Sequence, residues 1–125
     1  HIGLIPDAGS TYFLPRLAGS GKAMGLAMLG DKIPADDAEK LGLIWKVVAD
    51  EDLLTEAGAL AARLAKGPTK GLGLIKKAMN ASLVNDLPTQ LGVERDLQRE
   101  AAQTSDFAEG VSAFAQKRKP DFKGK

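Results

Sequence analysis

The stretch Ile2–Gly19, IGLIPDAGSTYFLPRLAG, carries the pattern that decides the fold of this chain. Its first residues form an apolar run that Pro6 ends, which predicts a short buried strand over residues 2–5. Gly9 permits a tight reversal of the backbone, and a helix follows until Gly19 closes it. Because the chain starts inside a strand–turn–helix unit with no polar lead-in, we expect the first half of the protein to lie elsewhere.

Helix signals dominate the rest of the sequence. Proline, glycine and capping residues mark where helices start and end, and they predict helices over residues 20–29, 34–41, 52–66, 68–80, 88–103 and 105–117. We expect Ser20, Asp50 and Ser105 to cap three of them. A second short strand is predicted at Leu43–Val48, which is apolar and contains β-branched residues. Two isolated strands are not stable without partners, so the chain is predicted to be mainly α with one or two short strands.

The composition is typical of one globular domain with a hydrophobic core, since 44% of the 125 residues are hydrophobic and 26% are charged. We expect Met24, Met28 and Trp45 to fill this core. The net charge is +1 with both signs mixed along the chain, which gives no field to attract nucleic acid or an anionic membrane. Without a membrane span or a signal-peptide pattern, a cytoplasmic location is expected.

Metal and thiol chemistry have little support in the sequence. There is no cysteine, and the single histidine is His1, so a metal site would need carboxylates alone. The acidic runs Asp36–Asp37 and Asp50–Asp52 fall at helix starts, where acids are expected for electrostatic reasons. Gly67–Gly73 lacks the spacing of a phosphate-binding loop and is interpreted as a helix start. We therefore expect no metal.

Asp7 is the only acidic residue among the first thirty, and two interpretations of it stay open. Its side chain could cap the glycine turn by accepting a backbone N–H, which the spacing alone favours. Alternatively, burial between Ile5–Pro6 and Ala8 would raise the pKa of its carboxyl and suit it to proton transfer near neutral pH.

The basic run Lys117–Lys119 also has two interpretations. It could hold phosphates, with the nearby Phe114 ring stacking on a base. A bare run of this kind is more often a solvated helix end that complements the helix dipole. The segment that follows, RKPDFKGK, is polar and interrupted by proline, and we expect it not to pack by itself.

Four segments together resemble, in order and spacing, the C-terminal half of the crotonase (enoyl-CoA hydratase/isomerase) superfamily: IGLIPDAGSTYFLPRLAG, AMLGDKIPADDAEKLGLIWKVV, KGPTKGLGLIKKAMNASL and FAQKRKPDFKGK. The resemblance spans essentially the whole chain, and the Pro6–Asp7 pair is most similar to isomerases that act on ring-epoxidised phenylacetyl-CoA. It implies the helical C-terminal part of a ββα-spiral fold. Residues 1–49 would be the end of the catalytic core, and residues 50–125 a helical region for trimerisation and CoA contact.

The resemblance also implies a mechanism. Crotonases bind an acyl-CoA thioester, hold its oxygen with two backbone N–H groups and stabilise the enolate. An aspartate matching Asp7 directs the proton in the isomerases, whereas a glutamate slightly upstream of it serves the hydratases. Phe114 and Lys117 match residues that contact CoA, which favours ligand binding for the basic run. The implied partners are an acyl-CoA substrate and further copies of the chain in a trimer or hexamer, with no covalent cofactor, metal, nucleic acid or membrane.

Some positions depart from the family pattern. Ser10 replaces a usual second glycine, and Gly71 stands where alanine is common. The N-terminal spiral that supplies the oxyanion hole is missing, so we expect the 125-residue chain alone to be inactive. The leading hypothesis is an acyl-CoA isomerase of phenylacetate or fatty-acid catabolism. The alternatives are an enoyl-CoA hydratase and a non-catalytic helical oligomerisation module.

Overall fold

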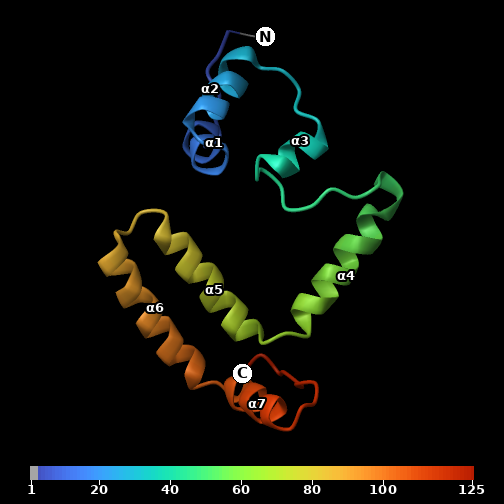
Figure 1. Cartoon of the computed structure of the whole chain (residues 1–125), viewed down its shortest axis with the longest axis vertical. Helices are drawn as coiled ribbons and strands as arrows, with labels where there is room; N and C mark the ends of the chain where they lie inside the picture. Colours follow the sequence, from blue (N-terminus) through green and yellow to red (C-terminus); the bar gives the residue numbers. More distant parts are fainter. Residues whose placement is uncertain (1–2) are drawn as a thin grey trace. The chain divides into compact units, whose positions relative to one another are not determined.

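The computed structural model describes residues 3–125, and this part of the chain is helical (Figure 1). It divides into two compact units, His1–Leu53 and Leu54–Lys125. The prediction of a mainly α chain is confirmed. The elements in chain order are α1 (Ser10–Ala18), α2 (Ser20–Leu29), α3 (Ala35–Lys40), the 3₁₀ turn η1 (Asp50–Asp52), α4 (Leu53–Ala65), α5 (Thr69–Ser82), α6 (Leu87–Ala102) and α7 (Ser105–Ala115).

The two short strands that the sequence predicts do not form within residues 3–125. Residues 3–5 are irregular, and Ile2 lies outside the described residues. Residues 43–48 are also irregular, and the Leu43 N–H donates to the Ala38 carbonyl at 2.9 Å, just behind it in the chain. A strand exists only through hydrogen bonds to a neighbouring strand, and no other segment described here offers that edge.

Glycines delimit the helices of the first unit. α1 and α2 pack against each other, and a single residue, Gly19 with φ 77°, joins them. Gly19 also takes the N-cap position of α2, so the prediction that Ser20 caps this helix is wrong. Gly30 ends α2 in the left-handed conformation with φ 68° and donates its N–H to the Leu26 carbonyl, as expected for a glycine stop.

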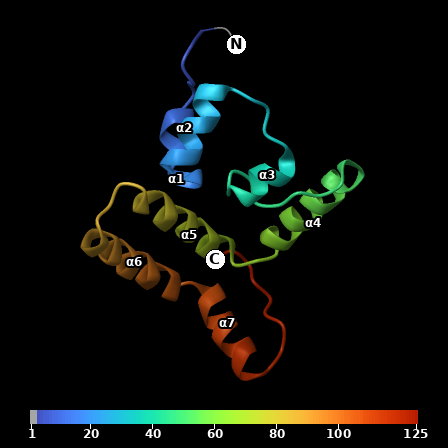
Figure 2. The same cartoon turned by 45° about the horizontal axis from the view of Figure 1, so that its top comes forward.

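The second unit is built on α5 and α6, which lie side by side (Figures 1 and 2). Asp86 caps α6 by accepting the Thr89 N–H at 2.9 Å. The buried Gln90 then joins the two helices, because its Nε2 donates to the Ala78 carbonyl of α5 at 3.1 Å and its Oε1 accepts from Asn85 Nδ2 at 3.0 Å. Among residues 3–125 no buried side-chain nitrogen or oxygen is left without a hydrogen-bond partner.

Two further capping predictions are wrong. Thr104, rather than Ser105, caps α7, since its Oγ1 accepts the Phe107 N–H at 3.0 Å. Asp50 does not cap α4 but opens the 3₁₀ turn η1 ahead of it. The error at α7 arises because the adjacent polar residues Thr104 and Ser105 offer equivalent capping groups in sequence. The error at α4 arises because the turn η1 lies between Asp50 and the first residue of the helix.

The hydrophobic core of the described residues is small. Its buried apolar side chains are Ala23, Leu97 and Ala113. The prediction that Met24, Met28 and Trp45 fill the core is wrong, since they are 56%, 76% and 75% exposed. Their helix faces and loops have no covering element within residues 3–125. Exposed apolar surface of this extent marks an interaction face.

None of the helices in the described part has both the length and the apolar character that a bilayer crossing requires.

Candidate functional site

Asp7 lies in the irregular segment that leads into α1, and its side chain is exposed. Its backbone carbonyl closes the turn by accepting the Ser10 N–H at 2.9 Å and the Ser10 Oγ–H at 2.7 Å. The N-cap of α1 is Gly9, with no side-chain cap. The interpretation of the Asp7 side chain as a cap is therefore wrong. Within residues 3–125 its carboxylate accepts no hydrogen bond and forms no ion pair, so the described residues give it no structural role.

The turn after Asp7 is strained. Ala8 has φ 51° and Gly9 has φ 87°, so two successive residues are left-handed. A residue with a Cβ pays about 1–2 kcal/mol for this conformation. Gly9 is required for a second reason, because a Cβ there would approach the Phe13 ring to 3.2 Å. The turn thus fixes the backbone at Asp7 at an energetic cost.

The apolar pocket expected around Asp7 is not supplied by the described residues. Leu4 and Ile5, which precede it, are both exposed, as is Asp7 itself. Burial of this carboxyl would need an element that covers these side chains.

An aromatic cluster that sequence reasoning missed follows the turn. The Arg16 guanidinium lies 3.5 Å from the centre of the Tyr12 ring, and its Nη1 donates to the Tyr12 carbonyl at 2.9 Å. The Tyr12 and Phe13 rings meet edge to face, with centroids 5.1 Å apart. The i,i+4 spacing of Tyr12 and Arg16 is the signal that predicts such a pair.

Phe114 and Lys117 lie at the C-terminal end of α7. Phe114 is 87% exposed, and Lys117 is exposed as well. The Lys117 N–H donates to the Phe114 carbonyl at 3.2 Å, and the Arg118 N–H donates to the Ala113 carbonyl at 3.0 Å. This is the bonding pattern of a Schellman motif. Lys117 takes its left-handed position with φ 52°, where glycine is the usual residue.

The segment Arg118–Lys125 folds back along α7 (Figure 2), so the prediction that it does not pack is wrong. We call this segment the tail. Glu109 receives two hydrogen bonds from the Arg118 guanidinium, at 2.6 and 2.9 Å, and the Asp121 N–H at 2.8 Å. Asp106, only 3% exposed, accepts the Lys123 N–H at 2.6 Å and the Gly124 N–H at 2.8 Å.

The tail also reaches the start of α7 and of α5. The Lys125 carbonyl accepts the Asp106 N–H at 3.2 Å and the Ser105 Oγ–H at 2.9 Å. Gly124 has φ 73°, and a Cβ on it would collide with Thr69 Oγ1. The signal in the sequence for this packing was the presence of two acids on α7 and of basic residues in the tail. Most of the hydrogen bonds that the two carboxylates accept, however, come from backbone N–H groups of the tail.

The electrostatics of the tail follow from these bonds. The Arg118 guanidinium, together with the Asp121 N–H, lowers the pKa of the Glu109 carboxyl from 4.5 to about 2. Glu109 in turn raises the pKa of Arg118. Both shifts mean that the charged pair is favoured at every pH near neutrality.

The predicted residues fall into both units. Asp7 belongs to the first unit, whereas Phe114 and Lys117 share the second with the tail. No group of three or more His, Cys, Asp or Glu within residues 3–125 is arranged to hold a metal ion.

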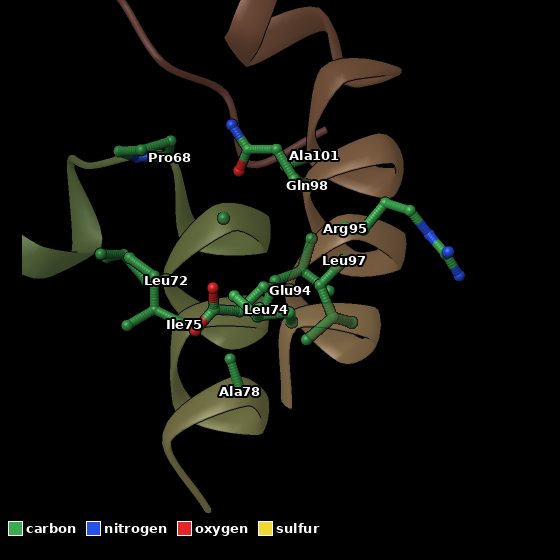
Figure 3. A pocket seen from close by; sticks show the side chains of 12 residues that line it. Pro68, Leu72, Leu74, Ile75, Ala78, Glu94, Arg95, Leu97, Gln98 and Ala101 are labelled. Carbon is green, nitrogen blue, oxygen red and sulfur yellow. The ribbon is translucent and has the colours of Figure 1, made fainter. Parts of the chain in front are cut away.

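A hollow of about 650 Å³ lies between α5 and α6 in the second unit. Figure 3 shows it from close by, with residues of α5 on one side and residues of α6 on the other. It contains none of the predicted site residues. Most of its lining is apolar, and the lining residues are Pro68, Gly71, Leu72, Leu74, Ile75, Ala78, Leu91, Glu94, Arg95, Leu97, Gln98 and Ala101.

Comparison with known proteins defines the class. The family described as Enoyl-CoA hydratase/isomerase matches residues 1–125, and the chain therefore belongs to this family of enzymes. The crystal structure of a Geobacillus kaustophilus HTA426 protein described as "Enoyl-CoA Hydrates Subunit I Other Form" has a TM-score of 0.95 and 37% identity, over 99% of this chain and 48% of that one. The predicted fold class, the helical C-terminal part of a crotonase fold, is confirmed.

Two curated relatives narrow the comparison. The chain is 55% identical over 124 residues to the 1,2-epoxyphenylacetyl-CoA isomerase of Escherichia coli (strain K12), covering 99% of this chain and 47% of the relative. It is 49% identical over 125 residues to the "Probable enoyl-CoA hydratase" of Rhodobacter capsulatus, covering 100% of this chain and 49% of the relative. The chain thus spans about half the length of the curated relatives it matches.

Proposed function

We propose that the complete protein isomerises an acyl-CoA thioester through an enolate, in phenylacetate or fatty-acid catabolism, and that Asp7 moves the proton. The observation that carries this proposal is the carboxylate of Asp7, which has no hydrogen-bond or ion-pair partner among residues 3–125 while its backbone carbonyl closes a strained turn. Strain at a non-glycine residue is commonly retained where function needs the geometry. The relative at 55% identity is named as an isomerase, which favours isomerisation.

The proposed chemistry needs one base and no net change in composition. The Asp7 carboxylate takes a proton from carbon and becomes a carboxylic acid, while the electron pair of the C–H bond enters the enolate. The acid then returns the proton to a different carbon, and the carboxylate is restored. Backbone N–H groups that stabilise the enolate oxygen would come from another part of the complete protein.

Asp7→Asn in the complete protein tests the assignment. The amide cannot accept the proton, so turnover should fall by roughly 10²–10⁴-fold, with nearly unchanged affinity for CoA. Asp50→Asn is the matched control, because Asp50 is also an exposed acid of the first unit, and it should leave turnover unaltered. An Asp7→Asn enzyme with wild-type turnover would refute the role of Asp7.

Lys117 and Phe114 are proposed to bind coenzyme A, with the ammonium on a phosphate and the ring on the adenine. Two properties of the described residues support this. Phe114 is almost fully exposed although it is large and apolar. Lys117 keeps a charged side chain at a position where glycine would remove backbone strain.

Hydration of a 2-enoyl-CoA is the second candidate, because the relative at 49% identity is named as a probable enoyl-CoA hydratase. Assays of the complete protein with a 2-enoyl-CoA and with a ring-epoxidised phenylacetyl-CoA distinguish the two. Water addition without isomerisation would decide for the hydratase. The hydratase also needs a second carboxylate beyond Asp7.

We further propose that the complete protein is a homotrimer or hexamer. The exposed apolar side chains on the helices of the second unit, among them Leu91, Phe107 and Val111, support an assembly that covers them. Light scattering of the complete protein measures the mass of the particle, and a monomer would contradict this proposal.

A further inference from the structure

One face of α7 is devoted to the tail. Asp106, Glu109, Gly110 and Ala113 follow one another at i, i+3, i+4 and i+7, which places them on the same side of the helix. All four are buried or half-buried, whereas the neighbouring face exposes Phe107, Val111 and Phe114. α7 therefore presents one covered side and one open side.

Residues on the covered side of α7 contact the tail at both of its ends and at its middle. Glu109 binds its beginning through Arg118 and Asp121, and Asp106 binds its end through the N–H groups of Lys123 and Gly124. Between these points the half-buried Phe122 ring approaches Gly110, where an added Cβ would lie 3.6 Å from the ring. The two carboxylates thus act as the two ends of a clamp.

This clamp bears directly on Lys117, because Arg118 is the next residue. Arg118 is held by Glu109 through both terminal nitrogens and donates its Nε–H to Gln116 Oε1 at 2.9 Å. Lys117 lies between the end of α7 and this anchored arginine, so its left-handed backbone follows from the path of the tail. If the tail were released, the backbone of Lys117 could relax into the right-handed helical conformation. Its Cα–Cβ bond, and with it the side chain, would then point in a different direction.

We infer that Glu109 and Asp106 are positioning residues, which clamp the tail along α7 and thereby hold Lys117 in the conformation that presents its ammonium to a phosphate of coenzyme A. This inference rests on the proposed role of Lys117 in binding that ligand. Neither carboxylate contacts the ligand in this scheme. Their effect on binding passes entirely through the backbone at residues 117 and 118.

A double-mutant cycle in the complete protein tests the inference, with coenzyme A itself as the probe and calorimetry as the measurement. Lys117→Ala should raise the Kd roughly 5-fold, the upper range for an exposed charge pair. Glu109→Gln should raise it by up to the same factor, and should add nothing in the Lys117→Ala background. Asp96→Asn is the control, since it removes a different exposed ion pair of the second unit, to Arg95 at 2.9 Å, and should leave the Kd unchanged.

The outcomes separate the two proposals. An unchanged Kd in Lys117→Ala would overturn the proposed role of Lys117, and the inference with it. If Lys117→Ala raises the Kd for coenzyme A but Glu109→Gln does not, the clamp alone is overturned. The same holds if both variants raise the Kd and their factors multiply in the double variant.

Two further measurements distinguish positioning from loss of structure. Hydrogen exchange at the Asp121 amide in the free protein should accelerate in Glu109→Gln, while helix amides of α5 and α6 keep their protection. Binding of pantetheine, which lacks the phosphates and the adenine, should be equal in wild type and Glu109→Gln. Equal losses for pantetheine and coenzyme A would show a general structural defect instead.

Discussion

Replacing Lys117 with glycine should stabilise the protein while weakening its binding of coenzyme A. Lys117 is left-handed at φ 52°, and a residue with a Cβ pays about 1–2 kcal/mol there. Glycine removes this cost but loses about 0.5–1 kcal/mol through its larger freedom in the unfolded chain. The difference is a net gain of roughly 0–1.5 kcal/mol in the free energy of unfolding.

The measurement is chemical denaturation of the complete protein, with two matched variants. Lys117→Ala keeps a Cβ and the strain, so it should not gain stability, although it loses the same ammonium. Ala115→Gly lies two residues earlier, at the helical end of α7, and should lose about 0.5–1 kcal/mol. If Lys117→Gly loses as much stability as Ala115→Gly, position 117 is not strained and the reasoning fails.

Two further predictions concern the tail. Gly124→Ala should release the tail, at a cost of about 1–3 kcal/mol for strained backbone, because the new Cβ meets Thr69; hydrogen exchange at the Lys123 amide reports the release, and unchanged protection would contradict it. The pKa of Glu109 is lowered from 4.5 to about 2, so its stabilising effect is complete above about pH 4.5 and is lost as the pH falls towards 2. Denaturation followed across this range should show a larger loss in wild type than in Glu109→Gln, in which Asp86 and Asp96, whose pKa values are also lowered, still contribute.

The helices were predictable because their signals are local. Gly19, Gly30 and Pro34 mark ends that the structure reproduces within a residue or two. The cap of α7 was misplaced because the neighbouring polar residues Thr104 and Ser105 carry the same signal, and that of α4 because a 3₁₀ turn precedes the helix. The strands failed for a different reason, since strand pairing depends on partners that a local pattern cannot supply.

The candidate site was predictable only in part. Asp7, Phe114 and Lys117 were singled out from their setting in the sequence, and their roles stay predictions. Spacing could not decide how Asp7 closes the turn, because a side chain and a backbone carbonyl at that position accept the same donors. The tail escaped prediction because its bonds join residues 17 and 18 positions apart, Asp106 with Lys123 and Gly124, and end on backbone N–H groups that every sequence has.

The return of the tail to the first turn of α7 changes how this part of the chain can open. Irregular surface segments are usually more mobile than the helices beside them, but here the Lys125 carbonyl is bonded to Ser105 and Asp106. Hydrogen bonds at both ends of the tail close residues 105–125 into a ring, and each bond holds the backbone in the position that the other bonds require. Opening such a ring is cooperative, so a partly bound tail should be rare. The backbone of Lys117 should therefore exchange between two conformations, one with the tail bound and one with the tail released.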